Sequence, residues 1–357
     1  MKYLIVIMCV LCFSQCSHNN SSEIREVGVN VEDCETCPAD SFDYDVLPLE
    51  DTPKGIVSSI GRMVVTDNGY FISDSRGTPV LYLFAKDGKF IRMIDKHGHS
   101  QKEYARIFNF TANEKGDTIA ILDNMGGEMK LYDQYGHFLS RHVFDDEYSW
   151  DDCAIIDNHF YMVSYHGGNK GIVTKYNSDF TKKEIIGDCS RPLVSGAGVS
   201  DTKYIQYNSS LICYMDYFDS SFFLIDRKSN VIVKKYTLSS SNMLTSEYVT
   251  EKVFGYDQIL SFTLADDCLY LELQVKDKAA AFKLDLADDK LYKLDTFIGF
   301  LDYKGKSFYS SISAEYVKIN IDTDRYLHRN ENRLKAFSVY EDKLKVQENP
   351  FVVVNYP

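Results

Sequence analysis

The sequence predicts an all-β fold, a six-bladed β-propeller with four-stranded antiparallel blades. The first observation is an internal repeat, because residues 69–90 return as residues 117–138 and Gly88 aligns with Gly136, 48 positions later. A period of 40 to 50 residues built from short strands is typical of propeller blades. The second observation is an aromatic content of 14%, in residue types that favour strands.

The beginning of the chain predicts export and a lipid anchor. Lys2 precedes an apolar run over residues 3–13, which is the pattern of a secretory signal and is short for a membrane span. Cys16 stands where a bacterial lipoprotein signal places its lipidated cysteine. We therefore expect residues 1–15 to be a lipoprotein signal peptide. A plain secretory signal with an incidental cysteine is the alternative.

Residues 16–40 are expected to form a lipidated cysteine and a polar tether, ahead of a propeller over residues 41–357. Cys34 and Cys37 form a Cys-x-x-Cys pair within this tether, in a compartment where disulfides are permitted. A local disulfide is the preferred interpretation. An inert thiol pair, or a redox or metal site, are the alternatives.

Short apolar stretches separated by turn residues locate the blades. We expect them at about residues 60–95, 107–144, 151–187, 201–237, 257–294 and 308 to the end. Asp87 and Gly88 form a hairpin turn, because glycine accepts a positive φ without steric cost. Residues 316–321 read as the clearest strand of the sixth blade, and residues 246–253 as the only short helical segment.

The ring must close, because open sheet edges attract further strands. Residues 42–49 and 351–355 are apolar stretches near the two ends of the chain, and we expect them to pair in one blade. An array of β-sandwiches is the alternative. Cys213 and Cys268 lie within apolar strand-like runs and are expected to be buried.

Three stretches carry a resemblance to a known family: residues 47–63, residues 94–104 and residues 348–354. Over residues 44–356 the chain resembles the six-bladed β-propeller lipoproteins of gut-type anaerobic bacteria, which are related to TolB-like and NHL-repeat propellers. The resemblance implies the fold and an envelope location, and it implies no established activity. Residues 17–22 lack acidic residues, which by this resemblance favours an outer-membrane anchor that faces the periplasm.

The charge of the chain argues against nucleic acid as a partner. Its formal net charge is −13, which repels phosphate backbones, and no basic patch with interleaved aromatic residues is present. The membrane is therefore expected to be reached through the lipid anchor.

The best polar cluster for ligand binding is Arg76, Glu103, Tyr104 and Arg106. Arginine can bind a carboxylate or phosphate through two parallel hydrogen bonds, and tyrosine suits a sugar or a peptide. The alternative is that Glu103 and Tyr104 hold the loop between the first two blades together.

No catalytic residue, metal site or cofactor is predicted. The sequence lacks a Gly-x-Ser-x-Gly elbow, and its histidines show no spacing diagnostic of zinc. We therefore expect a cell-envelope lipoprotein whose propeller binds a glycan, a peptide or an envelope protein. The alternative is a metal-dependent hydrolase or lyase that acts on glycans or peptides at the axial channel. A subunit of an envelope assembly is a third, weaker hypothesis.

Overall fold

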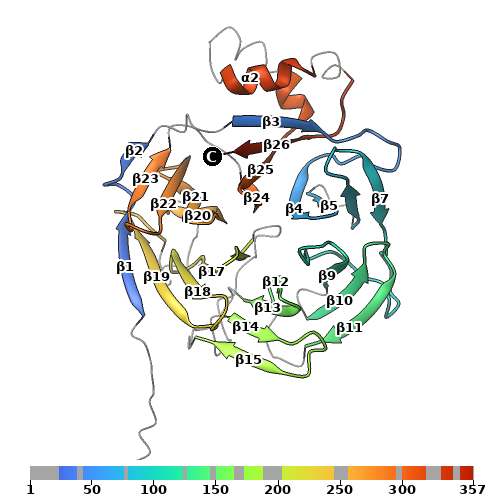
Figure 1. Ribbon diagram of the computed structural model, residues 1–357, viewed down its shortest axis with the longest axis horizontal. Coiled ribbons are helices and arrows are strands. Elements are labelled where there is room, and N and C mark those ends of the chain that lie inside the picture. Colours follow the sequence, from blue (N-terminus) through green and yellow to red (C-terminus); the bar gives the residue numbers. More distant parts are fainter. Residues whose placement is uncertain are drawn as a thin grey trace, which may run out of the picture.

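Six β-sheets stand in a ring around a central axis, so the predicted six-bladed β-propeller is confirmed (Figure 1). The computed structural model describes residues 24–37, 43–75, 79–123, 127–144, 150–164, 173–187, 203–244, 256–294, 300–318, 331–340 and 346–356. The blade positions agree with the sequence-based expectation within a few residues for the first five blades.

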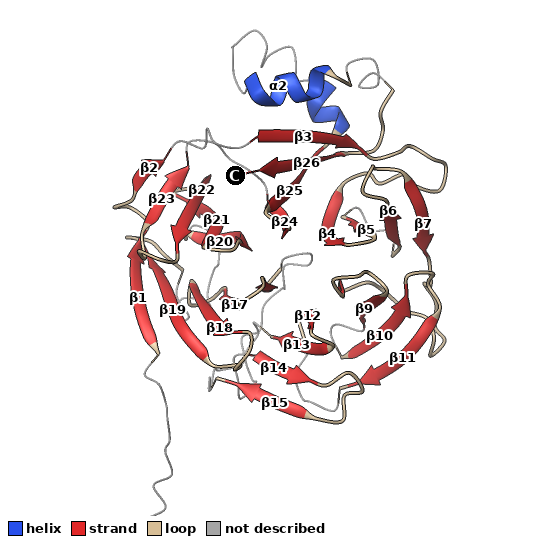
Figure 2. Cartoon of the chain, in the orientation of Figure 1, coloured by secondary structure: helices blue, strands red, loops and turns tan. Residues whose placement is uncertain are grey.

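In the first three blades, four consecutive strands form an antiparallel meander from the axis to the rim (Figure 2). The strands of blade 1 are β4 (Ile60–Thr66), β5 (Gly69–Asp74), β6 (Leu81–Phe84) and β7 (Phe90–Ile94). Those of blade 2 are β8 (Asn109–Ala112), β9 (Thr118–Asp123), β10 (Glu128–Asp133) and β11 (Phe138–Val143). Those of blade 3 are β12 (Asp152–Ile156), β13 (His159–Val163), β14 (Val173–Tyr176) and β15 (Lys183–Ile186).

Blades 4 and 5 have the same meander and one further strand at the rim. Blade 4 consists of β16 (Ile205–Tyr207), β17 (Leu211–Asp216), β18 (Ser221–Asp226), β19 (Ile232–Ser239) and the outer β1 (Arg25–Asn30). Blade 5 consists of β20 (Gln258–Leu264), β21 (Cys268–Val275), β22 (Lys278–Asp285), β23 (Leu291–Leu294) and the outer β2 (Glu35–Cys37).

Blade 6 closes the ring with both ends of the propeller. Its strands are β24 (Phe300–Lys304), β25 (Ser307–Ile312), β26 (Phe351–Tyr356) and β3 (Asp43–Pro48). The last strand, β26, pairs antiparallel with the early strand β3, and Val353 stands opposite Val46. The expected pairing of the two ends is therefore confirmed. Blade 6 is thereby completed by a strand from the other end of the propeller chain.

The region between β25 and β26 differs from the expectation. Residues 314–318 are helical, where a strand over 316–321 was expected, and the unforeseen helix α2 (Glu331–Ser338) lies outside β3 (Figure 2). Ala314 and Val317 are buried three positions apart, which is a helical spacing. Five residues are too few for that period to be distinguished from the alternation of a strand. The helix expected at 246–253 lies outside the described residues.

The expected tether also differs from the structure. Within residues 16–40, β1 pairs in parallel with β19 and β2 pairs in parallel with β23, so both strands belong to the rim of the propeller. Val27, Val29 and Val31 alternate along this segment, and Val29 and Val31 are buried in the largest core cluster. This alternation is the period of a half-buried strand.

Cys34 and Cys37 are not joined by a disulfide, in contrast to the local bridge that the sequence suggested. Because β2 is extended, an advance of three residues covers about 10 Å, which exceeds the roughly 7 Å limit between the Cα atoms of a disulfide. The Cys34 thiol instead donates a hydrogen bond to the Val31 carbonyl oxygen at 3.1 Å. Pairing of β2 with β23 therefore keeps the two thiols apart.

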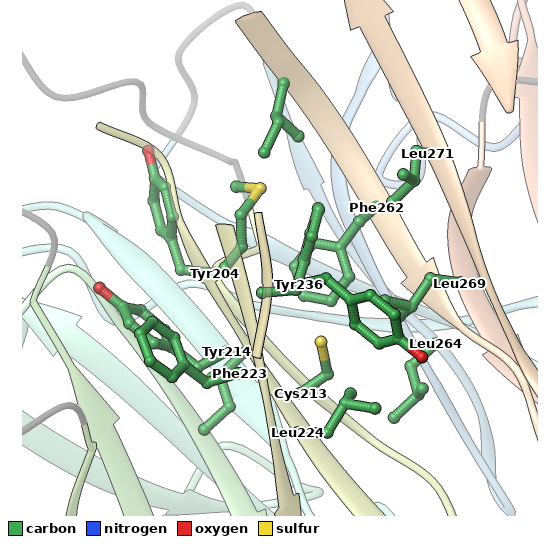
Figure 3. Packing of buried hydrophobic residues seen from close by; sticks show 14 of the residues in the cluster. Tyr204, Cys213, Tyr214, Phe223, Leu224, Tyr236, Phe262, Leu264, Leu269 and Leu271 are labelled. Carbon is green, nitrogen blue, oxygen red and sulfur yellow. The ribbon is translucent and has the colours of Figure 1, made fainter. Parts of the chain in front are cut away.

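The largest apolar cluster joins the facing sheets of blades 3, 4 and 5. Figure 3 shows Cys213 within this cluster, near Leu224, Tyr236 and Leu264. The burial expected for Cys213 and Cys268 is confirmed. Large aromatic and aliphatic side chains thus fill the wedge between neighbouring blades and hold the blades in fixed positions around the axis.

The turns at Gly88 and Gly136 provide a matched test of ring closure. Both glycines have a positive φ, of 81° and 80°. A Cβ at Gly88 would lie 2.4 Å from the Pro48 carbonyl oxygen of β3, whereas at Gly136 the closest atom would belong to the Ile94 side chain at 3.3 Å.

We expect Gly136→Ala to destabilise the fold by about 1–2 kcal/mol, mainly through backbone strain, with a small shift of the Ile94 side chain. Gly88→Ala should cost about 1–3 kcal/mol more, because β3 must also move away. Urea unfolding of both variants measures the difference. Equal losses of stability would show that β3 yields freely and does not limit closure.

Candidate functional site

A cavity of about 920 Å³ lies on the ring axis, and residues from all six blades line it. Its walls come from the innermost strands β4, β8, β12, β16 and β24. Its mouth is formed by the hairpins that follow these strands, including residues 113–114, 208–210 and 305–306. We call this cavity the axial pocket. It lies where propellers commonly bind ligands.

A buried ion pair joins the innermost strands of blades 1 and 3 beside the axial pocket, and its Arg62 partner lines the cavity. The Arg62 guanidinium of β4 donates to Asp152 Oδ1 of β12 at 2.7 Å, and the two side chains are only 3% and 0% exposed. Asp152 Oδ2 also accepts hydrogen bonds from the backbone N–H groups of Tyr204 and Ile205, at 2.7 and 3.2 Å. This carboxylate therefore joins blades 1, 3 and 4 at one point.

A second ion pair crosses the pocket beside the first. Lys203 Nζ lies 2.8 Å from Asp302 Oδ1, and Asp302 Oδ2 accepts a hydrogen bond from the Val65 N–H at 2.7 Å. Burial lowers the pKa of Lys203, and the carboxylate of Asp302 opposes that shift. Desolvation therefore penalises the charged ammonium at this position, and the attraction of the Asp302 carboxylate offsets part of that penalty. This pair connects blades 4, 6 and 1.

Arg227, in the turn between β18 and β19, is the most highly coordinated cation at the mouth. Its guanidinium donates two hydrogen bonds to Asp157, at 2.9 and 2.7 Å, and these bonds lower the pKa of that carboxyl. It also donates to the Asn208 carbonyl oxygen at 2.8 Å and lies 5.4 Å from the centre of the Tyr207 ring. Glu114 approaches it at 3.4 Å. Arg227 therefore links the hairpins of blades 2, 3 and 4.

Lys304 makes the corresponding link on the opposite side of the mouth. Its ammonium lies 2.8 Å from Asp67 Oδ1 in the first hairpin of blade 1, and it donates to the Glu114 carbonyl oxygen at 2.8 Å. Lys304 and Arg227 thus flank the blade 2 hairpin. The mouth of the axial pocket is held by charged contacts between blades, which fixes its shape before any ligand arrives.

The described residues contain no group of three or more histidine, cysteine or carboxylate side chains that could hold a metal ion. Cys153 lines the pocket, but burial raises its thiol pKa far above the usual range. A thiol with a raised pKa is a poor nucleophile at neutral pH.

The structure does not bring the ligand residues predicted from the sequence together at this pocket. Arg76 and Cys16, the residue at which lipidation is predicted, lie outside the described residues. Glu103, Tyr104 and Arg106 lie in the loop between β7 and β8, and none of them lines the cavity. Because this loop precedes β8 and the pocket hairpin follows it, the two lie at opposite ends of that strand.

Glu103 and Tyr104 hold the interblade loop in place, as the alternative interpretation proposed. A Glu103 carboxylate oxygen accepts a hydrogen bond from the Ser100 N–H at 3.0 Å. Tyr104 is fully buried, and its hydroxyl donates to the Ile94 carbonyl oxygen at 2.9 Å. Burial raises the pKa of this hydroxyl. Both side chains therefore stabilise the protein itself.

Asp152 was not among the site residues expected from the sequence. The pair Asp151 and Asp152 reads as a solvated turn, yet both residues are buried. The apolar run 153–156 that follows is the one signal for burial, because it begins a strand directly after the two carboxylates. The partner, Arg62, lies 90 positions earlier in the chain, and local sequence patterns carry no information on that pairing.

The chain belongs to the family described as domain of unknown function DUF4934, whose model matches residues 39–355. Among solved structures, it is similar to a Bacteroides fragilis protein described as exported, at 15% identity and a TM-score of 0.69. That match covers 92% of this chain and 99% of the other. A member of the DUF4221 family from Bacteroides vulgatus matches at 10% identity and a TM-score of 0.53, covering 88% and 95% of the two chains.

At these identities the likeness establishes the fold alone. No curated protein matches the sequence. Within the described part of the chain, no helix has the length and apolar character needed to cross a bilayer.

The Arg62–Asp152 pair predicts a large mutational effect. Arg62→Met leaves the Asp152 charge buried with backbone N–H donors alone, and breaking a buried pair in this way typically costs about 3–5 kcal/mol. We expect a loss near the lower end, measured by urea unfolding. The control is Arg106→Met, because Arg106 is exposed and contacts the Phe108 ring at 5.6 Å. If both variants lose less than about 1 kcal/mol, the pair does not hold the blades together.

Proposed function

We propose that this member of the DUF4934 family is a cell-envelope lipoprotein whose propeller binds a ligand in the axial pocket, without chemical turnover. The observation that supports binding is the pocket itself, a cavity of about 920 Å³ lined by all six blades. Ligand pockets typically measure about 300–1,000 Å³ and are largely formed before the ligand binds.

The charged contacts of the pocket favour binding because they prepare its shape. Arg62, Lys203, Arg227 and Lys304 are each held by a carboxylate from another blade. A site whose side chains are already fixed loses less conformational entropy when a ligand arrives. The function therefore follows from rigidity around a cavity, and a metal ion or a nucleophile is not needed for it.

The lipid anchor is supported by the signal-like residues 1–15 and by Cys16, and export is also supported by the similar Bacteroides fragilis protein, which is described as exported. The first rim strand, β1, begins at Arg25. Nine residue steps separate Cys16 from Arg25, and a fully extended chain covers about 30 Å over that span. A lipidated Cys16 would therefore hold blade 4 close to the membrane, which we propose to be the periplasmic face of the outer membrane.

Thermal unfolding of the mature protein tests ligand binding against the metal-dependent alternative. A binding protein should unfold at the same temperature with and without EDTA, and one glycan or peptide of a panel should raise that temperature. A ligand at one hundred times its dissociation constant adds about 2.7 kcal/mol of stability. Loss of stability in EDTA that one metal ion restores would contradict the proposal and favour a hydrolase or lyase.

Anchoring is tested by Cys16→Ser. The wild-type protein should incorporate an alkynyl fatty acid and sediment with membranes, whereas Cys16→Ser should lose the label and appear in the soluble envelope fraction. Cys34→Ser is the matched control, since Cys34 lies beyond the signal, and it should keep both properties. Fatty-acid labelling of Cys16→Ser would disprove lipidation at this residue.

A further inference from the structure

We propose that the axial pocket binds an acidic oligosaccharide whose carboxylates contact Lys228 and Lys306 at the mouth. This inference rests on the proposed ligand-binding function and names the chemical class of the ligand. Three properties of the pocket support it. The first is the sign of the charged side chains that have no partner in the protein, the second is the kind of polar group that has no hydrogen-bond partner, and the third is the size of the cavity.

The acidic side chains of the pocket are all engaged by the protein. Asp157 and Glu114 contact Arg227, and Asp302 contacts Lys203. Asp226 accepts hydrogen bonds from Ser229, at 2.7 Å from its N–H and 2.6 Å from its hydroxyl. The remaining one, Asp266, accepts a hydrogen bond from the Tyr303 hydroxyl. Each of these carboxylates therefore already has a partner within the protein.

Two lysines of the pocket lining form no ion pair with the described residues. Among the described residues, no carboxylate lies within 4 Å of the ammonium group of Lys228 or Lys306, and both side chains belong to exposed residues. Lys228 follows β18 in blade 4, and Lys306 is in the hairpin after β24 in blade 6. The unengaged charge of the pocket is therefore positive and is divided between two blades. A ligand that carries separate negative groups matches this arrangement.

The uncharged polar side chains of the pocket that lack a hydrogen-bond partner among the described residues are hydroxyls, because the side-chain amides are already hydrogen-bonded. The amide of Gln206 donates to the Phe262 carbonyl oxygen and accepts from the Leu264 N–H. Asn208 donates to the Ala265 carbonyl oxygen and accepts from the Ser210 N–H.

In contrast, the hydroxyls of Tyr207 and Ser209 have no hydrogen-bond partner among the described residues. A hydroxyl both donates and accepts. Such groups pair readily with the hydroxyls of a saccharide, whereas a peptide backbone would find the amides already occupied.

The size and walls of the pocket fit an oligomer. A volume of about 920 Å³ is near the upper end of the range for small-molecule pockets, so the cavity holds more than one sugar unit. Val64, Ala112 and Ala154 line it from three innermost strands. These small apolar side chains can pack against the C–H faces of sugar rings. Repeating acidic sugars would then place carboxylates at intervals along the mouth.

Calorimetric titration of the mature protein with a galacturonate trimer tests the proposal. We expect binding that weakens about tenfold in Lys228→Gln and in Lys306→Gln, because each ammonium makes a charge-assisted hydrogen bond. Binding should also weaken as salt is raised, since exposed charges are screened. The fully methyl-esterified trimer keeps the shape of the ligand without its charge and should bind at least tenfold more weakly.

The matched control is Lys290→Gln. Lys290 ends the equivalent turn of blade 5, is exposed, lies outside the pocket lining and approaches Asp288 only at 4.0 Å. This variant removes one positive charge from the protein and should change the affinity by less than twofold.

Equal affinity for the acidic and esterified trimers would overturn the role of the lysines and leave ligand binding in place. Binding of a triglutamate peptide, without binding of either trimer, would show that the ligand is an acidic peptide and not a saccharide. Failure of the galacturonate trimer to bind overturns the ligand class as well. Any stabilising ligand in the thermal panel would show that the ligand-binding function itself survives.

Discussion

The antiparallel pairing of β26 with β3 is the constraint on which the rest of the structure depends. It brings two segments together that are separated by almost the whole propeller, and it converts a row of blades into a closed ring. Only a closed ring directs six innermost strands at one axis. The axial pocket, the ion pairs beside it and the charged mouth all exist because that closure fixes the blades relative to one another.

Polar contacts connect the blades near the axis, and several of them are charged pairs. Wedge-shaped sheets leave a central gap that water can enter, and the side chains that meet there must remain compatible with it. Behind the wall of this gap, Arg62 and Asp152 pair between blades 1 and 3, and Asp152 also accepts backbone hydrogen bonds from blade 4. A buried ion pair can fix the relative positions of the groups that it joins even where it adds little net stability. The same contacts therefore hold the blades and set the shape of the pocket.

Local sequence patterns predicted the strands and turns of the blades, but they did not predict the contacts between residues of different blades. The repeat of Gly88 at Gly136 and the alternating apolar runs were enough to identify five blades and the closing strands. The Val27, Val29 and Val31 alternation could also have revealed β1, had the polar composition around it not suggested a tether. The axial pocket could not be predicted from such local patterns. The contacts of Asp152 and Lys203 span 90 and 99 positions, and no local period encodes a contact between separate blades.

The acidic body and the open lysines of the pocket are compatible because charge acts over a short range in salt. The chain carries a net charge of −13, which opposes the approach of any anion at long distance. At physiological ionic strength the screening length is about 8 Å, so a ligand that has reached the mouth responds mainly to the groups beside it. There the carboxylates are already engaged and the ammonium groups of Lys228 and Lys306 are not. The local charge of the pocket, and not the total charge of the protein, therefore determines which ligand is retained.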